Sequence, residues 1–371
     1  MSKNPIRIAI ADDSYVARSV LKQIVAGQAD MFVAAEAQNG EEALDICRRA
    51  TIDVLLLDIE MPGLDGIEVL KILLREKQTT KVIVVSALTQ RHAPTAVQAL
   101  SLGASAYLAK PTHLNQRRGL EHVAAELLDL IRNLVPISTR STENEPGDED
   151  HHSDTFRDAL PFRSKPSKKA RKDIKLVVVG SSTGGPNALS RLLQDISQPL
   201  NVPMFLVQHM PGMFLPQLAK RLSMDSGLHV VMGDHGIIAE PGTVYLAPAD
   251  CHMELTRAKD DRIQIQLTDG PAEVFCKPSV NPLFRSAARG WGRHALGIIL
   301  TGMGEDGLDG CRSLRYRNAT IYVQDRESSV VWGMPRAVAG ENLADGIFDI
   351  NDIGTKINDL IKVIRADKVI L

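Results

Sequence analysis

A run of small residues, GSSTGG at 180–185, contains side chains whose types and spacing suggest covalent chemistry. Gly180, Ser182 and Gly184 satisfy the pattern G-x-S-x-G, in which small neighbours let a tight turn expose a serine hydroxyl. The run lacks the lysine of a phosphate-binding P-loop and the glycine spacing of a dinucleotide fingerprint. A Ser/Gly turn without chemistry is the remaining alternative, so a nucleophilic serine needs partners elsewhere in the chain.

A nucleophilic serine needs a base, and the base needs an acid to orient it. His209 follows the apolar run 204–207, and Asp306 comes shortly after the apolar run 296–300. The carboxyl ends of parallel strands meet at one edge of a sheet, where ligands bind. We therefore expect Ser182, His209 and Asp306 at the same edge.

A second pair keeps another arrangement open. Asp250 and His294 would give the chain order Ser, Asp, His that an α/β-hydrolase presents. Chain order is a weak criterion, because the same constellation recurs on unrelated folds. The remaining histidines of this region (His229, His235 and His252) do not follow predicted strands, and we expect them in loops or in the core.

Another group of polar residues follows the predicted strands of the first 110 residues. It comprises Asp12, Asp13, Asp58, Ser86 and Lys110. Clustered carboxylates repel one another unless a cation joins them, and hard oxygen ligands suit Mg²⁺. A carboxylate also accepts a phosphoryl group as an acyl phosphate. The hydroxyl of Ser86 and the ammonium of Lys110 would then hold the phosphoryl oxygens.

The elements that must position this first group alternate regularly. Apolar runs predict five strands, which alternate with five helices over about 130 residues and therefore favour a doubly wound parallel sheet. The predicted strands are 6–11, 31–37, 54–57, 82–85 and 106–109.

The second half repeats the pattern of a strand followed by a polar turn. The predicted strands are 176–179, 204–207, 242–246, 296–300 and 320–323, with a helix at 186–195. Residues 253–256 and 262–267 alternate around a charged turn, which is typical of a β-hairpin. The sequence thus predicts a second doubly wound α/β domain with a β-hairpin insertion.

Composition restricts the remaining possibilities. The 371 residues suffice for several domains, and the formal net charge of -2 favours neither nucleic acid nor an anionic membrane as partner. No apolar run approaches a membrane span and no signal peptide is recognisable, so we expect a cytoplasmic protein without membrane insertion. The cysteines form no C-x-x-C pair, and we expect small buried hydrophobic side chains at Cys47, Cys251, Cys276 and Cys311.

Periodicity disappears between the two predicted domains. Residues 136–173 are first acidic and then basic, with little apolar content, as is typical of a flexible linker. The basic run is expected to be solvated, and the adjacent pair His151 and His152 is a weak case for a metal site. The predicted domains are therefore 1–135 and 174–371.

The acid pair, the block LLLDIEMPGLDG at 55–66 and Lys110-Pro111 together resemble the receiver domain of bacterial response regulators. The resemblance implies a flavodoxin-like fold of residues 1–135 and phosphorylation of Asp58 by a partner histidine kinase. It also implies Mg²⁺ bound near Asp58 and a switch near the phosphorylated aspartate. The candidate metal ligands are Asp12, Asp13, Asp58 and Glu60, and the candidate switch residues are Ser86, Tyr107 and Lys110.

The motifs of the second half are GSSTGG, QHMP, HMEL, KPSV, LTGMGEDG and GMPR. Together they resemble the catalytic domain of the chemotaxis protein-glutamate methylesterases, the CheB family. The resemblance implies Ser182 as nucleophile, His209 as general base, Asp306 as orienting acid, the Met303 N–H in the oxyanion hole and Thr183 beside the nucleophile. It implies demethylation and glutamine deamidation of methyl-accepting chemoreceptors, with the unphosphorylated receiver covering the active-site cleft and no cofactor at the esterase site.

Two positions depart from the family pattern. Asn281 stands where Asp is common, and Glu305 stands where Asn is common, so we expect altered substrate contacts there. Three alternatives to the esterase stay open. They are a docking module with a vestigial triad, a DNA-binding regulator and a generic esterase of small molecules. The second lacks a helix-turn-helix pattern or a basic face in the second domain.

Overall fold

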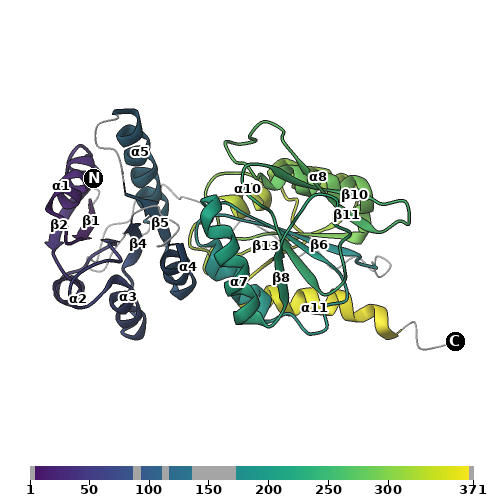
Figure 1. Ribbon diagram of the computed structural model, residues 1–371, viewed down its shortest axis with the longest axis horizontal. Helices are drawn as coiled ribbons and strands as arrows, with labels where there is room; N and C mark the ends of the chain where they lie inside the picture. Colours follow the sequence, from purple (N-terminus) through teal and green to yellow (C-terminus); the bar gives the residue numbers. More distant parts are fainter. Residues whose placement is uncertain (1–4, 87–92, 111–116, 136–172, 367–371) are drawn as a thin grey trace, which may run out of the picture.

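The computed structural model describes residues 5–86, 93–110, 117–135 and 173–366. Figure 1 shows two α/β lobes side by side, one from each half of the chain. The predicted linker, except for its last residue, lies outside the described residues, as does the pair His151 and His152.

The N-terminal lobe contains one parallel sheet of five strands, in the order β2-β1-β3-β4-β5. Its elements are β1 (Ile6–Ala11), α1 (Tyr15–Ala26), β2 (Met31–Ala37), α2 (Gly40–Arg49), β3 (Val54–Leu57), α3 (Gly66–Arg75), β4 (Lys81–Ser86), α4 (Ala93–Leu102), β5 (Ala106–Ala109) and α5 (Arg117–Leu134). The helices α1, α2 and α3 each begin with an N-cap side chain that accepts a hydrogen bond from a backbone N–H of the first turn. These side chains are Ser14, Asn39 and Asp65. The predicted doubly wound five-stranded sheet is confirmed.

Alternate residues of the buried strands pack on opposite faces of this sheet. Ile8 and Ile10 of β1 pack with residues of α1 and α5, including Leu21 and Ile131. On the other face, Leu57 and its neighbours pack with α2, α3 and α4.

The C-terminal lobe contains a parallel sheet of seven strands, in the order β14-β13-β12-β6-β7-β9-β8, and a separate antiparallel hairpin. Its strands are β6 (Leu176–Ser181), β7 (Met204–Gln208), β8 (His229–Met232), β9 (Thr243–Leu246), β10 (His252–Arg257), β11 (Ile263–Thr268), β12 (Ala295–Ile299), β13 (Thr320–Gln324) and β14 (Gly346–Phe348). Its helices are α6 (Gly185–Gln194), α7 (Leu215–Ser226), α8 (Val280–Trp291), α9 (Leu308–Tyr316), α10 (Met334–Gly340) and α11 (Ile350–Ala366), with 3-10 turns η2 (Gly212–Phe214) and η3 (Gly292–His294).

Helices cover both faces of the seven-stranded sheet. Val177 and Val179 of β6 pack with α6, α7 and α11, whereas Leu176 and Val178 pack with α8, α9, α10 and the hairpin β10–β11. The predicted second α/β domain with a hairpin insertion is therefore confirmed. The predicted strand list was incomplete, because the edge strands β8 and β14 are only four and three residues long, too short for a clear apolar pattern.

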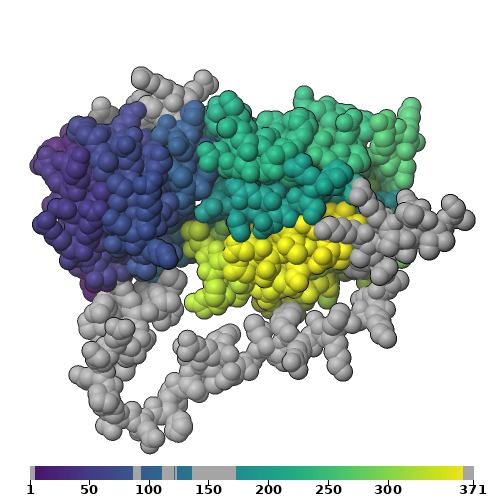
Figure 2. Space-filling view, turned by 90° about the horizontal axis from the view of Figure 1, so that it is seen from below, coloured from purple at the N-terminus to yellow at the C-terminus, as the bar shows by residue number. Residues whose placement is uncertain are grey.

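The two lobes share an apolar contact. One continuous cluster joins α4 residues such as Val97 to α6 and α7 residues such as Leu189 and Leu215. The ring of Tyr107 at the end of the N-terminal sheet meets the ring of Phe214 edge-on, with centroids 4.8 Å apart. In the space-filling view the lobes abut directly (Figure 2). Among the described residues, no helix is long and apolar enough to cross a membrane.

Candidate active site

The three candidate triad residues follow three adjacent strands of the seven-stranded sheet. Ser182 follows β6, His209 follows its neighbour β7, and Asp306 lies in the loop after β12 on the other side of β6. The strands are parallel, so all three loops emerge at the same edge. The three residues therefore lie at the same edge of the sheet, as we expected from the sequence.

Ser182 occupies a tight turn between β6 and α6. Its N–H donates to the Thr301 carbonyl at 3.0 Å, and its carbonyl accepts from the Gly185 N–H at 2.8 Å. Gly184 has a φ of 77°, in the left-handed region that favours glycine. A Cβ added to Gly302 would lie 2.8 Å from the Ser182 Cβ, so the loop after β12 approaches the serine as closely as its backbone allows.

Gln208, which sequence reasoning did not single out, fixes the relative position of the two loops. Its amide oxygen accepts from the Ser181 hydroxyl at 2.7 Å, and its amide nitrogen donates to the carbonyls of Ser182 and His209. The side chain is buried. Gln208 is therefore a positioning residue between the candidate nucleophile and base, and its place at the end of β7 was the available signal.

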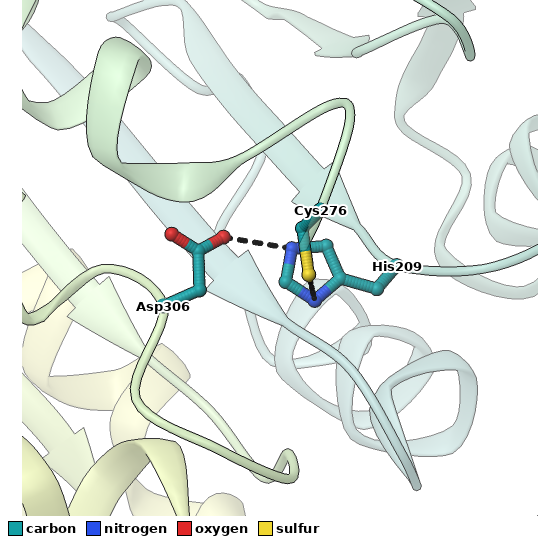
Figure 3. Close-up of side chains that lie close together, drawn as sticks. All are labelled: His209, Cys276 and Asp306. Atoms are coloured by element: carbon teal, nitrogen blue, oxygen red, sulfur yellow. Dashed lines mark hydrogen bonds and ion pairs between the residues drawn. The ribbon is translucent and has the colours of Figure 1, made fainter. Parts of the chain in front are cut away.

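His209 and Asp306 contact each other directly. The His209 Nε2 lies 2.9 Å from Asp306 Oδ2, and the carboxylate is only 2% exposed (Figure 3). A buried carboxylate on one ring nitrogen fixes the orientation of an imidazole and stabilises its protonated form. This is the arrangement that a general base requires.

The Asp306 carboxylate is fully engaged by its surroundings. Oδ1 accepts from the Ser279 hydroxyl at 2.7 Å and the Gly307 N–H at 2.8 Å, and Oδ2 also accepts from the Val280 N–H at 2.7 Å. Burial opposes ionisation, but the bond to His209 and these further bonds hold the pKa of Asp306 below its usual value. Asp306 is thus ionised and orients His209, and it does not act as a proton donor.

The other ring nitrogen of His209 faces a thiol. Cys276 Sγ lies 3.6 Å from His209 Nδ1, on the loop before α8 (Figure 3). The expectation of a buried hydrophobic cysteine is wrong for Cys276 and Cys251, which are half-buried, and is confirmed for Cys47 and Cys311. The signal was its spacing, two residues before the Pro278 of KPSV and four before Val280, whose N–H binds Asp306.

Although His209, Cys276 and Asp306 lie close enough to suggest a metal site, their hydrogen bonds argue otherwise. Asp306 faces Nε2 of His209, whereas Cys276 faces Nδ1 on the other side of the ring. An ion bound to one ring nitrogen would therefore not also bind both the carboxylate and the thiol. Each oxygen of the Asp306 carboxylate already accepts at least two hydrogen bonds. The geometry favours an oriented base.

The same contacts determine the protonation of His209. Burial lowers the pKa of His209, but the hydrogen bonds to Asp306 and Cys276 outweigh it and raise the pKa to about 9. The ring is therefore protonated at neutral pH in this conformation.

Met303 and Thr183 flank the serine. Met303 follows Gly302 in the loop that touches Ser182, and its sulfur accepts from the Asn133 amide of α5 at 3.2 Å. The Thr183 carbonyl accepts from the Thr301 hydroxyl at 2.9 Å, which ties the serine turn to the same loop. The N-terminal lobe therefore reaches the loop beside the candidate nucleophile.

The alternative pair of Asp250 and His294 is wrong. Asp250 follows the carboxyl end of β9, whereas His294 precedes the amino end of β12 at the opposite edge of the sheet. The His294 ring contacts the Asp173 carbonyl at 2.7 Å. His252 is buried between the Pro271 carbonyl and the Ser279 N–H, which confirms its expected core role.

The structure places the remaining histidines and the two departures from the family pattern. His235 lies in a loop as expected, whereas His229 begins β8. The Asn281 amide oxygen accepts from the N–H groups of Gly307 and Gly310, at 3.1 and 2.8 Å. Asn281 is buried and braces the Asp306 loop, so the expected substrate contact is wrong for it; Glu305 is exposed.

The N-terminal lobe holds the second group of polar residues at the carboxyl edge of its sheet. The Lys110 ammonium lies 2.6 Å from Asp58 Oδ2 and 2.7 Å from Asp12 Oδ2, and both aspartates are buried. Burial raises the pKa of Asp58, as does Asp12, while Lys110 opposes the increase. Asp12, Asp13 and Asp58 offer oxygens within 4.8 Å of one another, a donor set that suits Mg²⁺.

The other candidate receiver residues surround this cluster. Ser86 is buried at the end of β4, and its carbonyl accepts from the Tyr107 hydroxyl at 3.0 Å. Asp13 and Glu60 are exposed. Tyr107 therefore connects the Asp58 edge to the Phe214 ring of the other lobe.

Comparisons with known proteins match both lobes. Residues 177–357 match the family model described as CheB methylesterase, and residues 8–121 match the response regulator receiver domain. The chain is 38% identical to protein-glutamate methylesterase/protein-glutamine glutaminase 2 of Caulobacter vibrioides, over 94% of this chain and 97% of that protein. It is also 37% identical to a protein-glutamate methylesterase/protein-glutamine glutaminase of a Nocardioides strain, over 95% of this chain and 94% of that protein. The crystal structure of the Thermotoga maritima CheB methylesterase catalytic domain is 35% identical, covers 51% of this chain and 98% of that chain, and gives a TM-score of 0.49.

Proposed function

The chain belongs to the protein-glutamate methylesterase/protein-glutamine glutaminase family, and we propose that Ser182, His209 and Asp306 perform its chemistry. It is an enzyme that hydrolyses glutamate methyl esters and glutamine amides, and it carries an N-terminal receiver domain. The observation that supports our residue assignment is the buried His209–Asp306 pair at the sheet edge where the Ser182 turn emerges.

In the reaction, the Ser182 hydroxyl oxygen bonds to the carbonyl carbon of a modified glutamate, and the ring nitrogen of His209 that does not face Asp306 takes the proton. The tetrahedral intermediate collapses when the C–O bond to methanol breaks and His209 returns the proton to the leaving oxygen. Water then attacks the acyl-serine with His209 as base, which releases the glutamate carboxylate. With glutamine the leaving group is ammonia.

The developing oxyanion needs backbone donors beside Ser182. We assign this role to the Met303 N–H, because the loop containing Met303 packs against the Ser182 turn at Gly302. Thr183 stands next to the nucleophile and is tied to Thr301. In this conformation Cys276 contacts the ring nitrogen of His209 that must accept the Ser182 proton. The ring or the thiol must therefore shift before Ser182 is activated.

The receiver supplies regulation. Receivers generally use Mg²⁺ on phosphorylation, and the oxygen set of Asp12, Asp13 and Asp58 would hold it, with Glu60 close by in sequence. The cation would neutralise the incoming phosphoryl group at Asp58, and Lys110 would bind its oxygens. Because α5 contacts Met303, we propose that the unphosphorylated receiver restricts access to Ser182 and that phosphorylation favours an open state.

The partners follow from the two domains. A histidine kinase is the proposed phosphodonor for Asp58, and the cytoplasmic parts of methyl-accepting chemoreceptors are the proposed substrates. We accordingly propose that the enzyme acts in the cytoplasm. We propose neither nucleic-acid binding nor membrane insertion.

Methanol release from a methylated chemoreceptor fragment, with and without acetyl phosphate and Mg²⁺, tests the proposal. We expect release by the wild type, its loss in Ser182→Ala, and loss of only the stimulation by phosphodonor in Asp58→Asn. A wild type that takes up phosphate but releases no methanol from any receptor would favour the docking-module alternative.

A further inference from the structure

The loop before α8 contains a two-residue turn between Glu273 and Cys276. The backbone N–H groups and carbonyls of these two residues bond to each other, at 3.1 and 2.8 Å. The residues at the tip, Val274 and Phe275, have φ values of 49° and 62°. Two consecutive left-handed residues are typical of a type I′ turn, in which Asn-Gly is the preferred sequence.

Valine and phenylalanine are poor residues for this backbone. A β-branched or bulky side chain with positive φ is an outlier that persists only when the surroundings determine it. Here Glu273 forms an ion pair with Arg285 of α8, and Lys277 forms one with Asp269. The flanks of the turn are thus anchored to the fold.

The tip itself is not used for packing. Phe275 is fully exposed, at 103% of its reference area, and Val274 is 40% exposed. A strained backbone that displays two apolar side chains to water does not contribute to the core. The next residue, Cys276, contacts the His209 ring (Figure 3). The exposed tip therefore directly precedes a residue of the candidate site.

We propose that Val274 and Phe275 form a docking knob for the polypeptide segment that carries the modified glutamate. A glutamate side chain is short, so its own backbone must lie at the rim when its ester reaches Ser182. Apolar residues beside that glutamate then cover Phe275. This inference rests on the proposed esterase function and adds a specificity determinant for protein over small-molecule esters.

The sharpest test replaces Val274→Asn together with Phe275→Gly. The new pair prefers the observed turn, so the unfolding temperature should stay equal or rise. Burial of one Phe side chain corresponds to roughly ten- to hundredfold in affinity, and we expect kcat/KM on a methylated receptor fragment to fall by about that factor, mainly through KM. Hydrolysis of a small γ-methyl ester of N-acetylglutamate amide should remain unchanged.

Two further variants complete the experiment. Phe275→Ala should reproduce most of the loss, whereas Tyr316→Ala, which removes another exposed aromatic ring at the end of α9, should not. Equal loss on the small ester and the receptor would show a merely structural role, and an unchanged receptor rate would also overturn the knob. A wild type that cleaves the small ester but no receptor would instead refute the proposed function.

Discussion

Replacing Cys276 by alanine should make the esterase work at lower pH. The thiol and Asp306 both stabilise the protonated ring of His209, against burial, and the pKa of His209 is raised to about 9. A base is active only when deprotonated, so the rate should rise with pH and level off above this pKa. Without the Cys276 contact, the pKa of His209 falls and the rising limb moves to lower pH.

The magnitude follows from the position of that limb. At pH 7, two units below a pKa of about 9, roughly one ring in a hundred is neutral. Each unit by which the pKa falls in Cys276→Ala should therefore raise the rate at pH 7 about tenfold. One unit corresponds to about 1.4 kcal/mol of lost stabilisation of the imidazolium.

Initial rates on the small glutamyl methyl ester from about pH 6 to 10.5 measure the limb directly. Cys251→Ala is the matched control, because this cysteine lies outside the His209 contact. An unchanged limb, or one that moves to higher pH, would refute the reasoning. A plateau that collapses in Cys276→Ala but survives in Ser182→Ala would assign the nucleophile to the thiol.

Three other substitutions have defined outcomes. Asp306→Asn removes an acceptor from His209 Nε2, so kcat should fall roughly 10³- to 10⁴-fold while the fold persists by circular dichroism. Tyr107→Ala removes an edge-on ring pair with Phe214, worth about 0.5–1.5 kcal/mol, and should raise the unphosphorylated methanol-release rate roughly two- to tenfold. Asn281→Ala removes the side-chain acceptor of the buried Gly310 N–H and one of the two acceptors of the Gly307 N–H, and urea unfolding should show a loss of about 1–3 kcal/mol.

The edge that carries the site could be predicted because it depends on local patterns. An apolar run, a small-residue turn and a polar residue after each strand place Ser182, His209 and Asp306 without knowledge of the packing. The receiver sheet followed for the same reason, since strands such as β1, β3 and β4 are dominated by buried apolar residues.

The surroundings of His209 could not be predicted in this way. Cys276 reaches His209 through a loop with neither helical nor strand periodicity, and only the tertiary fold decides which ring nitrogen it meets. The strained turn at Val274 and Phe275 even contradicts local preference, because its sequence lacks the Asn-Gly signal. The role of Gln208 could not be predicted for a related reason, because its hydrogen bonds to Ser181 and Ser182 form only when neighbouring strands pair.

The apolar character of the contact between the lobes has a consequence for temperature. Aliphatic and aromatic side chains such as Val97, Leu189 and Phe214 make this contact, and apolar association weakens on cooling. Separation of the lobes therefore becomes easier in the cold, when the hydration of apolar surface opposes it least. A receptor-modifying enzyme built this way would lose part of its dependence on the phosphodonor as the temperature falls, because cooling and phosphorylation would act on the same contact.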